Sequence, residues 1–497
     1  MRLRCLLFLV LTVLFLPDRA VADPYGPSTH VNAPSVTYKA PVGIATNVAG
    51  ESIVAWSDRA TAGNPSVVLE RYDALGRPFG TDDQAVGTLV YDVALDDAGN
   101  FALLRLAAGA WTVSLYQRSG QFLRDVRVPD VGARMPAGNT VPAGLAMNGR
   151  GQFVVTWHAE TATGTALVAR TFAPNGSFMT GTTVVSEGRP AFEPDVAIDA
   201  AGNYVVTWDR FRSLTDRTSE VWAKRFSILG APLSDAIPVS TDRAADASRG
   251  RIAMAPSGAF VVAWVGRGGE QPPGSASQTT IARRFSSSAL PLGAPFRVDA
   301  SMSLWPTVAM ASNGSFVIAW GRGQGAAVAR TYDPNGVPLG SPFSLGEMPG
   351  VGFFPRVGMD AGGNVTALWG QLVSPGTSDQ SEIYLRQFSP YISPSLQNGV
   401  AITQLWGPIE SWRFYKITVP AGRSSVEFSI SGGAGATGDA DLYVRWGSLP
   451  TLEDWDGAPF LQGNDETARM LNFPPGDWYV GIHGYEAYSG LSVRAAY

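Results

Sequence analysis

One sequence pattern recurs seven times between residues 44 and 388 and dominates what this chain can fold into. Its clearest copy is Phe-Val-Ile-Ala-Trp at 316–320, followed by Val-Ala-Arg-Thr-Tyr at 328–332 and a Gly-x-Pro-x-Gly turn. Aligned copies are 49 to 56 residues apart, a period that indicates one supersecondary unit per repeat. The equivalent positions of the seven copies are Trp56, Arg105, Trp157, Trp208, Trp264, Trp320 and Trp369.

Each repeat contains four short apolar segments separated by turns rich in Gly and Asn. In the sixth repeat the segments are 307–310, 316–320, 327–332 and a stretch around Phe343. Their β-branched and aromatic residues, with no long stretch of 3.6-residue period, predict four antiparallel strands and no helix. One such sheet cannot bury both of its faces. Seven sheets packed radially can, so we predict an all-β seven-bladed β-propeller, with a linear solenoid as the alternative.

The two ends of the repeat array predict how the disc closes. The seventh repeat stops at Phe388 without a fourth strand. The segment 28–33 precedes the first complete strand in the same way that 295–300 precedes the sixth repeat. We therefore expect the N-terminal strand to complete the seventh blade.

Residues 1–22 are typical of a cleaved secretory signal peptide. Arg2 and Arg4 precede an apolar run at 6–16, and small residues at 20–22 lead to Asp23. The run is too short to span a bilayer comfortably, and no later segment is longer, so we expect export without a membrane span. The only cysteine, Cys5, lies inside this signal, which leaves the mature chain no disulfide.

The charge of the mature chain argues against nucleic acid as a partner. Removing 1–22 leaves 34 basic and 41 acidic residues, a formal net charge of −7. We expect a secreted, extracellular or periplasmic monomer that meets an extracellular protein or polysaccharide, with no cofactor.

The last hundred residues are a second all-β unit of a size ordinary for a sandwich. We expect the repeat domain at 23–390, a linker at 391–398 and this unit at 399–497. It resembles the bacterial pre-peptidase C-terminal domain, a β-sandwich appended to many secreted peptidases. The resemblance rests on four segments in order: 412–422 (Trp-Arg-Phe-Tyr-Lys-Ile-Thr-Val-Pro-Ala-Gly), 438–444 (Gly-Asp-Ala-Asp-Leu-Tyr-Val), 463–466 (Gly-Asn-Asp-Glu) and 476–485 (Gly-Asp-Trp-Tyr-Val-Gly-Ile-His-Gly-Tyr).

The resemblance implies extracellular delivery and surface or substrate attachment, because the family's module is itself not catalytic. Some collagen-binding relatives hold calcium with an acidic segment at the start of the domain. The corresponding stretch here, 395–401, has no carboxylate, so we transfer no metal site. Asp439 and Asp441 remain a weak alternative as oxygen ligands for a hard cation, against a role in shaping a turn.

No catalytic set is visible in the repeats. The three histidines, His30, His158 and His483, are far apart in sequence, and there is no nucleophile elbow, zinc-binding motif or calcium loop. Our leading hypothesis is therefore a non-enzymatic binding or adhesion protein. It presents one propeller face, where the longer connections gather, and carries a C-terminal module for attachment or export.

Two groups of residues are candidates for function on that face. Phe192, Trp305 and Phe354, which lie shortly before prolines at the start of first strands, together with Arg210, are predicted to bind a ligand, with packing between blades as the alternative. The second functional hypothesis is a secreted peptidase or carbohydrate-active hydrolase at the mouth of the central channel. Its catalytic candidates are Asp58, His158, Glu160 and Asp209.

Overall fold

The computed structural model describes most of the chain after the predicted signal peptide, which lies outside the described residues. The described ranges are 28–32, 37–59, 66–74, 76–80, 90–128, 143–161, 164–186, 191–212, 218–241, 246–267, 278–299, 301–322, 325–346, 352–372, 380–388, 395–407, 412–447, 450, 452 and 454–497. Within these ranges every regular element is a β-strand.

Seven antiparallel sheets precede residue 390, and we number them as blades in chain order. Blade 1 holds β2 (Tyr38–Thr46), β3 (Ser52–Arg59) and β4 (Ser66–Tyr72). Blade 2 holds β5 (Val90–Leu95), β6 (Phe101–Ala107), β7 (Ala110–Tyr116) and β8 (Phe122–Arg127). Blade 3 holds β9 (Ala143–Met147), β10 (Phe153–Thr161), β11 (Gly164–Phe172) and β12 (Thr183–Ser186). Blade 4 holds β13 (Ala191–Ile198), β14 (Tyr204–Phe211), β15 (Ser219–Phe226) and β16 (Ile237–Pro238).

The remaining three blades follow the same order. Blade 5 holds β17 (Asp246–Met254), β18 (Phe260–Arg267), β19 (Thr279–Phe285) and β20 (Phe296–Arg297). Blade 6 holds β21 (Ser303–Met310), β22 (Phe316–Arg322), β23 (Ala327–Tyr332) and β24 (Phe343–Ser344). Blade 7 holds β25 (Gly352–Met359), β26 (Val365–Leu372) and β27 (Ser381–Phe388), and its fourth strand is β1 (Thr29–His30).

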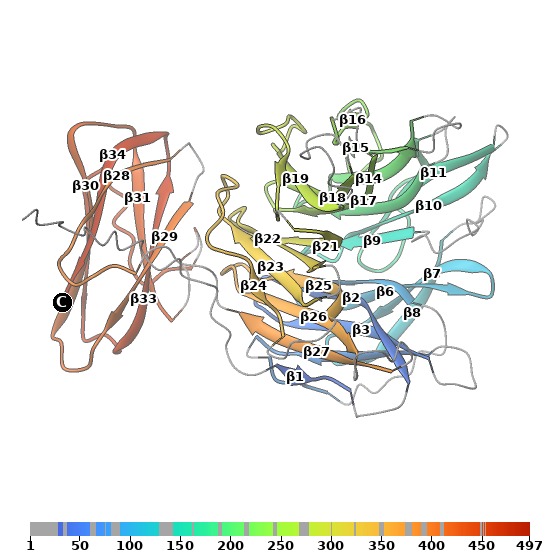
Figure 1. Ribbon diagram of the computed structural model, residues 1–497, viewed down its shortest axis with the longest axis horizontal. Coiled ribbons are helices and arrows are strands. Elements are labelled where there is room, and N and C mark those ends of the chain that lie inside the picture. The colour runs from blue at the N-terminus through green and yellow to red at the C-terminus, as the bar shows by residue number, and fades with distance from the viewer. Residues whose placement is uncertain are drawn as a thin grey trace, which may run out of the picture.

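The blades form a closed ring around their first strands. Each first strand contacts the first strand of the next blade, and β25 of blade 7 contacts β2 of blade 1. In Figure 1, β9, β21 and β25 lie toward the middle of the propeller, and β1 and β16 lie at its periphery. The predicted seven-bladed propeller is therefore confirmed, and the solenoid alternative is wrong.

A separate apolar cluster fills each interface between neighbouring blades. The tryptophans at the repeat's alignment position supply its bulk, and Trp157, Trp208, Trp320 and Trp369 are at most 1% exposed. Blade 2 has Arg105 at this position. Arg105 pairs with Asp125 at 2.7 Å, and Trp111 of the next strand fills the cluster shared with blade 3. Burial of apolar area between blades is the main stabilising term of such an array.

The closing interface joins blade 7 to blade 1 and to the N-terminal strand. Thr29 and His30 pair with Leu385 and Tyr384, which confirms the predicted strand exchange, while Ala33 of the predicted segment lies outside the described residues. A buried carboxylate, Glu382 of β27, lies 3.2 Å from the His30 ring and 3.5 Å from the Lys39 ammonium of blade 1. Lys39 is 2% exposed, so its charge depends on this partner.

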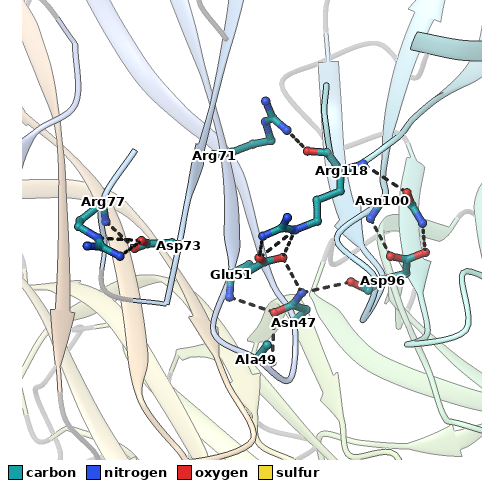
Figure 2. Close-up of polar contacts among 9 residues, drawn as sticks. All are labelled: Asn47, Ala49, Glu51, Arg71, Asp73, Arg77, Asp96, Asn100 and Arg118. Carbon is teal, nitrogen blue, oxygen red and sulfur yellow. Dashed lines mark hydrogen bonds and ion pairs between the residues drawn. The ribbon is translucent and has the colours of Figure 1, made fainter. Parts of the chain in front are cut away.

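Side-chain hydrogen bonds hold the turns on one face of the disc, as Figure 2 shows for blades 1 and 2. The Asn47 carboxamide accepts a hydrogen bond from the Glu51 amide at 2.9 Å and donates to the Asp96 carbonyl of blade 2 at 3.4 Å. Arg118 of blade 2 donates from Nε to Glu51 at 2.9 Å. These hydrogen bonds fix the short turns and join neighbouring blades on this face. The longer connections lie on the other face.

The C-terminal residues form a two-sheet sandwich, drawn as a separate body in orange to red in Figure 1. One sheet has the order β28 (Ile402–Gly407), β34 (Tyr488–Ala496), β30 (Ser425–Thr437), β32 (Glu466–Leu471), and the other β29 (Trp412–Val419), β33 (Gly476–Gly484), β31 (Ala440–Trp446). Residues 395–398, expected within a linker, lie against this body: the Leu396 amide donates to the Lys416 carbonyl at 2.7 Å, and Leu396 is buried in the sandwich core. No helix able to cross a membrane occurs in the described part of the chain.

The buried contacts of Glu382 predict a large effect on ring closure. Glu382→Gln should lower the free energy of unfolding of the propeller by about 3 kcal/mol, because the Lys39 charge loses its ionised partner. Chemical denaturation with tryptophan fluorescence measures this. The matched control is Glu220→Gln, whose half-buried pairs with Arg210 and Arg212 lie within one blade, and whose cost should stay below about 1 kcal/mol. Equal effects of the two variants would contradict the assigned role of Glu382.

Candidate functional site

The first strands place seven equivalent residues around the propeller axis. Six of the seven first strands carry a β-bulge, and the residue that follows it pairs with the residue just before the alignment position of the second strand. In β9, which has no recorded bulge, Gly144 pairs with Thr156 at the same register. A bulge re-aims the side chain that follows it. The seven equivalent residues are Gly43, Asp92, Gly144, Asp195, Arg251, Thr307 and Arg356.

Four of these seven residues are charged, and their charges converge. Asp92 of blade 2 interacts electrostatically with Asp195 of blade 4 and with Arg356 of blade 7, and Arg356 interacts with Asp195 and with Arg251 of blade 5. None of these blade pairs are neighbours in the ring. Side chains from non-adjacent blades can approach one another only at the axis, so the four charges meet there.

Backbone amides of the next blade orient the two carboxylates. Asp92 accepts hydrogen bonds from its neighbour Val93 at 2.9 Å and from Leu145 of blade 3 at 3.0 Å. Asp195 repeats this arrangement, with Val196 at 2.9 Å and Ile252 of blade 5 at 3.0 Å. Each carboxylate is therefore fixed by two backbone amides.

Two arginines lie among these carboxylates. The Arg251 guanidinium is 3.0 Å from Glu193 of blade 4, and their side chains are 22% and 14% exposed. Arg356 donates from Nε to the Val42 carbonyl of blade 1 at 3.1 Å. We call Asp92, Glu193, Asp195, Arg251 and Arg356 the axial cluster.

Burial perturbs the titration of the axial cluster. Burial, reinforced by the negative charge of Asp195, raises the pKa of Asp92 to about 7, against the lowering effect of its amide donors and of Arg356. Burial also raises the pKa of Asp195, but the Arg251 charge opposes the rise. Burial and the nearby Arg251 lower the pKa of Arg356 to about 10, which leaves it charged at neutral pH.

The bulges themselves hold four residues in a strained backbone conformation. Glu193, Arg249, Trp305 and Phe354 have φ of 46°, 60°, 52° and 47°, and they occupy equivalent positions in blades 4 to 7. A non-glycine residue at positive φ costs on the order of 1–3 kcal/mol, and such strain concentrates at functional sites. Two of the four are charged and two are aromatic.

The structure brings two of the three predicted aromatic residues together. The Trp305 and Phe354 rings meet edge to face across blades 6 and 7, with centroids 4.8 Å apart. Phe192 packs instead on Phe211 of its own blade at 4.4 Å. Arg210 also stays within its blade, with its guanidinium 3.8 Å from the Trp222 ring centre and 3.3 Å from Glu220.

The described side chains among the residues predicted as catalytic have hydrogen-bond partners in different parts of the propeller. Asp58 accepts a hydrogen bond from the Thr37 hydroxyl at 2.6 Å, and the ring of His158 lies 2.7 Å from the Ala191 carbonyl of blade 4. The side chain of Glu160 lies outside the described residues. Asp209 accepts hydrogen bonds from the Arg249 and Gly250 amides at 2.6 and 3.2 Å. Asp209 thus fixes the backbone of the blade 5 bulge. Burial raises the pKa of Asp209 to about 7. Catalytic roles for these four residues stay predictions.

The weak metal alternative in the sandwich has backbone partners. Asp439 accepts a hydrogen bond from the Gly463 amide at 3.0 Å, which shapes the turn before β32. Burial raises the pKa of Asp441 with help from the Asp439 charge. In the part of the chain that the structure describes, no group of three or more His, Cys, Asp or Glu residues is arranged to hold a metal ion.

The residues predicted as catalytic lie on the second strands, whereas the axial cluster, which was not predicted, lies on the first strands. A usable signal was present in the first strands, where the axial residue precedes an apolar-small-apolar triplet, as in Asp195-Val-Ala-Ile, Arg251-Ile-Ala-Met and Arg356-Val-Gly-Met. Charged residues recur at this register, but the sign of the charge differs from blade to blade. That these charges lie together at the axis follows only from closure of the ring.

Comparison with known proteins identifies the C-terminal module. Residues 413–484 match the family model of the bacterial pre-peptidase C-terminal domain, which confirms the resemblance. Alkaline serine exoprotease A of Vibrio alginolyticus is 41% identical over 103 residues, 20% of this chain and 18% of that protein. A zinc metalloprotease of Helicobacter pylori is 41% identical over 105 residues, 21% of this chain and 40% of that protein. The chain therefore spans less than half the length of either relative.

Solved structures that resemble the larger part of the chain are distant in sequence. The polysaccharide lyase Uly1 covers 72% of this chain and 92% of its own, with 11% identity and a TM-score of 0.45. A streptogramin B lyase covers 73% and 97%, with 12% identity and a TM-score of 0.44. We infer nothing about substrate from these two likenesses.

The relatives overturn the prediction of a non-enzymatic adhesion protein. The proteins that share the C-terminal module carry names of proteases, among them an extracellular protease of Xanthomonas campestris that is 41% identical over 103 residues. The prediction took the absence of sequence motifs as evidence against an enzyme. Motif absence says little when, as in the axial cluster, the charged groups come from four different blades.

The raised pKa of Asp92 predicts a pH-dependent contribution to stability. A carboxyl whose folded pKa lies above its unfolded value stabilises the fold below the unfolded pKa near 3.8, and this contribution is lost as pH rises to about 7. The unfolding free energy of the native protein minus that of Asp92→Asn should therefore fall by on the order of 4 kcal/mol between pH 4 and pH 7.5. Denaturant titrations at several pH values measure it, and a flat difference would contradict the assigned environment.

Proposed function

We propose that the protein is a secreted hydrolase whose chemistry takes place at the axial cluster. The observation that carries the proposal is the pair Asp92 and Asp195, two carboxylates held by backbone amides near the propeller axis beside two arginines, with the pKa of Asp92 raised to about 7. A carboxyl group whose pKa lies near neutrality can serve as the general acid of a pair of carboxyl groups.

Export is supported by two independent features. Residues 1–22 have the order of a secretory signal, and the C-terminal module is shared with an extracellular protease. In this proposal the propeller supplies the active site and the sandwich supplies delivery or attachment. The chain acts as a monomer on an extracellular polymer.

The two aspartates have different roles in this proposal. Asp92, whose pKa is raised to about 7, donates its proton to the leaving atom of the scissile bond. Asp195, beside the Arg251 charge that opposes the rise of its pKa, takes a proton from the attacking water. Each turnover consumes one water, and solvent exchange returns both carboxyl groups to their starting states.

The arginines and Asp209 position this pair. Arg251 and Glu193 form an ion pair that fixes the Arg251 charge near Asp195, where this charge favours the ionised form of Asp195. Arg356, fixed to the Val42 carbonyl, is placed to bind negative charge that develops on the substrate. Asp209 holds the blade 5 bulge through two amides and so sets the position of Arg251.

Turnover assays test the proposal. The purified mature protein should hydrolyse at least one polymer in a panel of casein, collagen and soluble polysaccharides. Its rate should fall above about pH 7, as Asp92 loses its proton. Asp92→Asn and Asp195→Asn should each reduce kcat by roughly 10²- to 10⁴-fold, the usual contribution of a general acid or base.

The matched control is Asp125→Asn in blade 2. The Asp125 side chain is 44% exposed and pairs with Arg105 away from the axis, so kcat should be unchanged. Turnover that survives both axial substitutions, or a complete lack of turnover on the panel, would contradict the proposal.

A further inference from the structure

Trp305 differs from the tryptophans that fill the blade interfaces. It is half-buried, whereas Trp320 of the same blade is fully buried and donates its indole N–H to Asp299 at 3.1 Å. Among the described residues, nothing accepts a hydrogen bond from the indole N–H of Trp305. A half-buried indole whose N–H has no acceptor among the described residues is an uncommon feature for a tryptophan that serves only packing.

The backbone around Trp305 and Phe354 presents their rings at the same level of the propeller as Glu193. All three residues occupy the positive-φ position of the bulge, each directly before a proline, and Glu193 reaches Arg251 of the axial cluster from that position. The equivalent position therefore directs the two aromatic side chains toward the same region. Gly321 makes room for the indole, since a β-carbon there would lie 3.1 Å from the Trp305 ring.

The edge-to-face contact orients the two rings without covering both. Their interplanar angle is 64°, so the Phe354 ring contacts Trp305 at an angle and does not stack flat on its face. Phe354 is in turn fixed by Phe353 at 5.4 Å, with an interplanar angle of 89°. Both rings are half-buried, and each keeps part of its surface accessible.

None of the three histidines belongs to the axial cluster. All three histidines of the chain are accounted for: His30 pairs with Glu382 at the ring closure, His158 lies against the Ala191 carbonyl, and His483 packs beside Tyr443 in the sandwich. The ionisable groups of the axial cluster are carboxylates and guanidinium groups. Hydrolysis of a glycosidic bond needs a pair of carboxylates and no imidazole, and so does peptide hydrolysis by a pair of aspartates, so the aromatic pair decides between the two substrate classes.

We propose that Trp305 and Phe354 form a stacking subsite for a sugar ring, so that the substrate of the axial cluster is a carbohydrate chain. The C–H groups on the face of a pyranose ring pack on an aromatic face, and the free indole N–H donates to a sugar hydroxyl. The proposal rests on the hydrolase function proposed above and names its substrate class.

The bond changes balance with water as the only co-reactant. The bond between the anomeric carbon and the glycosidic oxygen breaks, and the leaving oxygen takes the proton of Asp92. The oxygen of water bonds to the anomeric carbon, and its proton passes to Asp195. The reaction yields two shorter sugar chains.

Binding to the full-length Asp92→Asn protein tests the subsite without turnover. Isothermal titration would use hexasaccharides of glucose, galactose, xylose and N-acetylglucosamine, with a casein peptide for comparison. We expect one hexasaccharide class to bind. Trp305→Gly added to this protein should raise its Kd about tenfold, and Trp305→Tyr should restore most of the affinity. Trp446→Ala, which removes a 46% exposed tryptophan of the sandwich, is the control and should leave Kd unchanged.

The glycine variant also separates binding from packing. Glycine adopts positive φ at no steric cost, so relief of strain should offset the lost contact with Phe354, and the melting temperature should change little. An unchanged Kd in Trp305→Gly, or no binding of any hexasaccharide, would overturn the subsite. Peptide turnover without sugar binding would overturn the subsite but not the hydrolase. Sugar binding by a native protein that shows no turnover would contradict the hydrolase proposal and leave the subsite intact.

Discussion

Closure of the ring is the constraint on which the rest of the structure depends. Each blade buries apolar surface on two neighbours, and the last interface forms only when β1 joins blade 7 beside Lys39 and Glu382. Without that interface, blades 1 and 7 would each expose a face like those buried at the six other interfaces. Closure also fixes the distance of every first strand from the axis, and so decides which side chains can meet there.

The axial cluster is a direct consequence of this geometry. Bulges at one register direct Asp92, Asp195, Arg251 and Arg356 inward from four blades, and amides of the following blade hold the two aspartates. Burial raises the pKa of both aspartates, that of Asp92 to about 7, and the neighbouring arginine charges oppose the rise. Rigid blades thus supply a fixed arrangement of charge, the property that catalysis by preorganised groups requires.

The fold could be predicted from the sequence because its determinants are local and repeated. The tryptophan spacing, the turn residues and the displaced strand at 28–33 specify seven blades and their closure, and four motifs specify the C-terminal module. The site could not be predicted in the same way. Asp92 and Asp195 are 103 residues apart in non-adjacent blades, and Gly43, Gly144 and Thr307 occupy the same register without charge. Trp305 and Phe354 were found as residues near prolines, but their contact across two blades depends on packing.

The protonation state of Asp92 is the most direct test of this account. Infrared difference spectroscopy of the native protein against Asp92→Asn, followed through pH, reports the carbonyl stretch of this carboxyl group alone. The account predicts a protonated carboxyl that titrates near pH 7 and whose pKa falls when Asp195 is replaced by Asn. A carboxyl that is fully ionised above about pH 5, or one that is insensitive to Asp195, would contradict it.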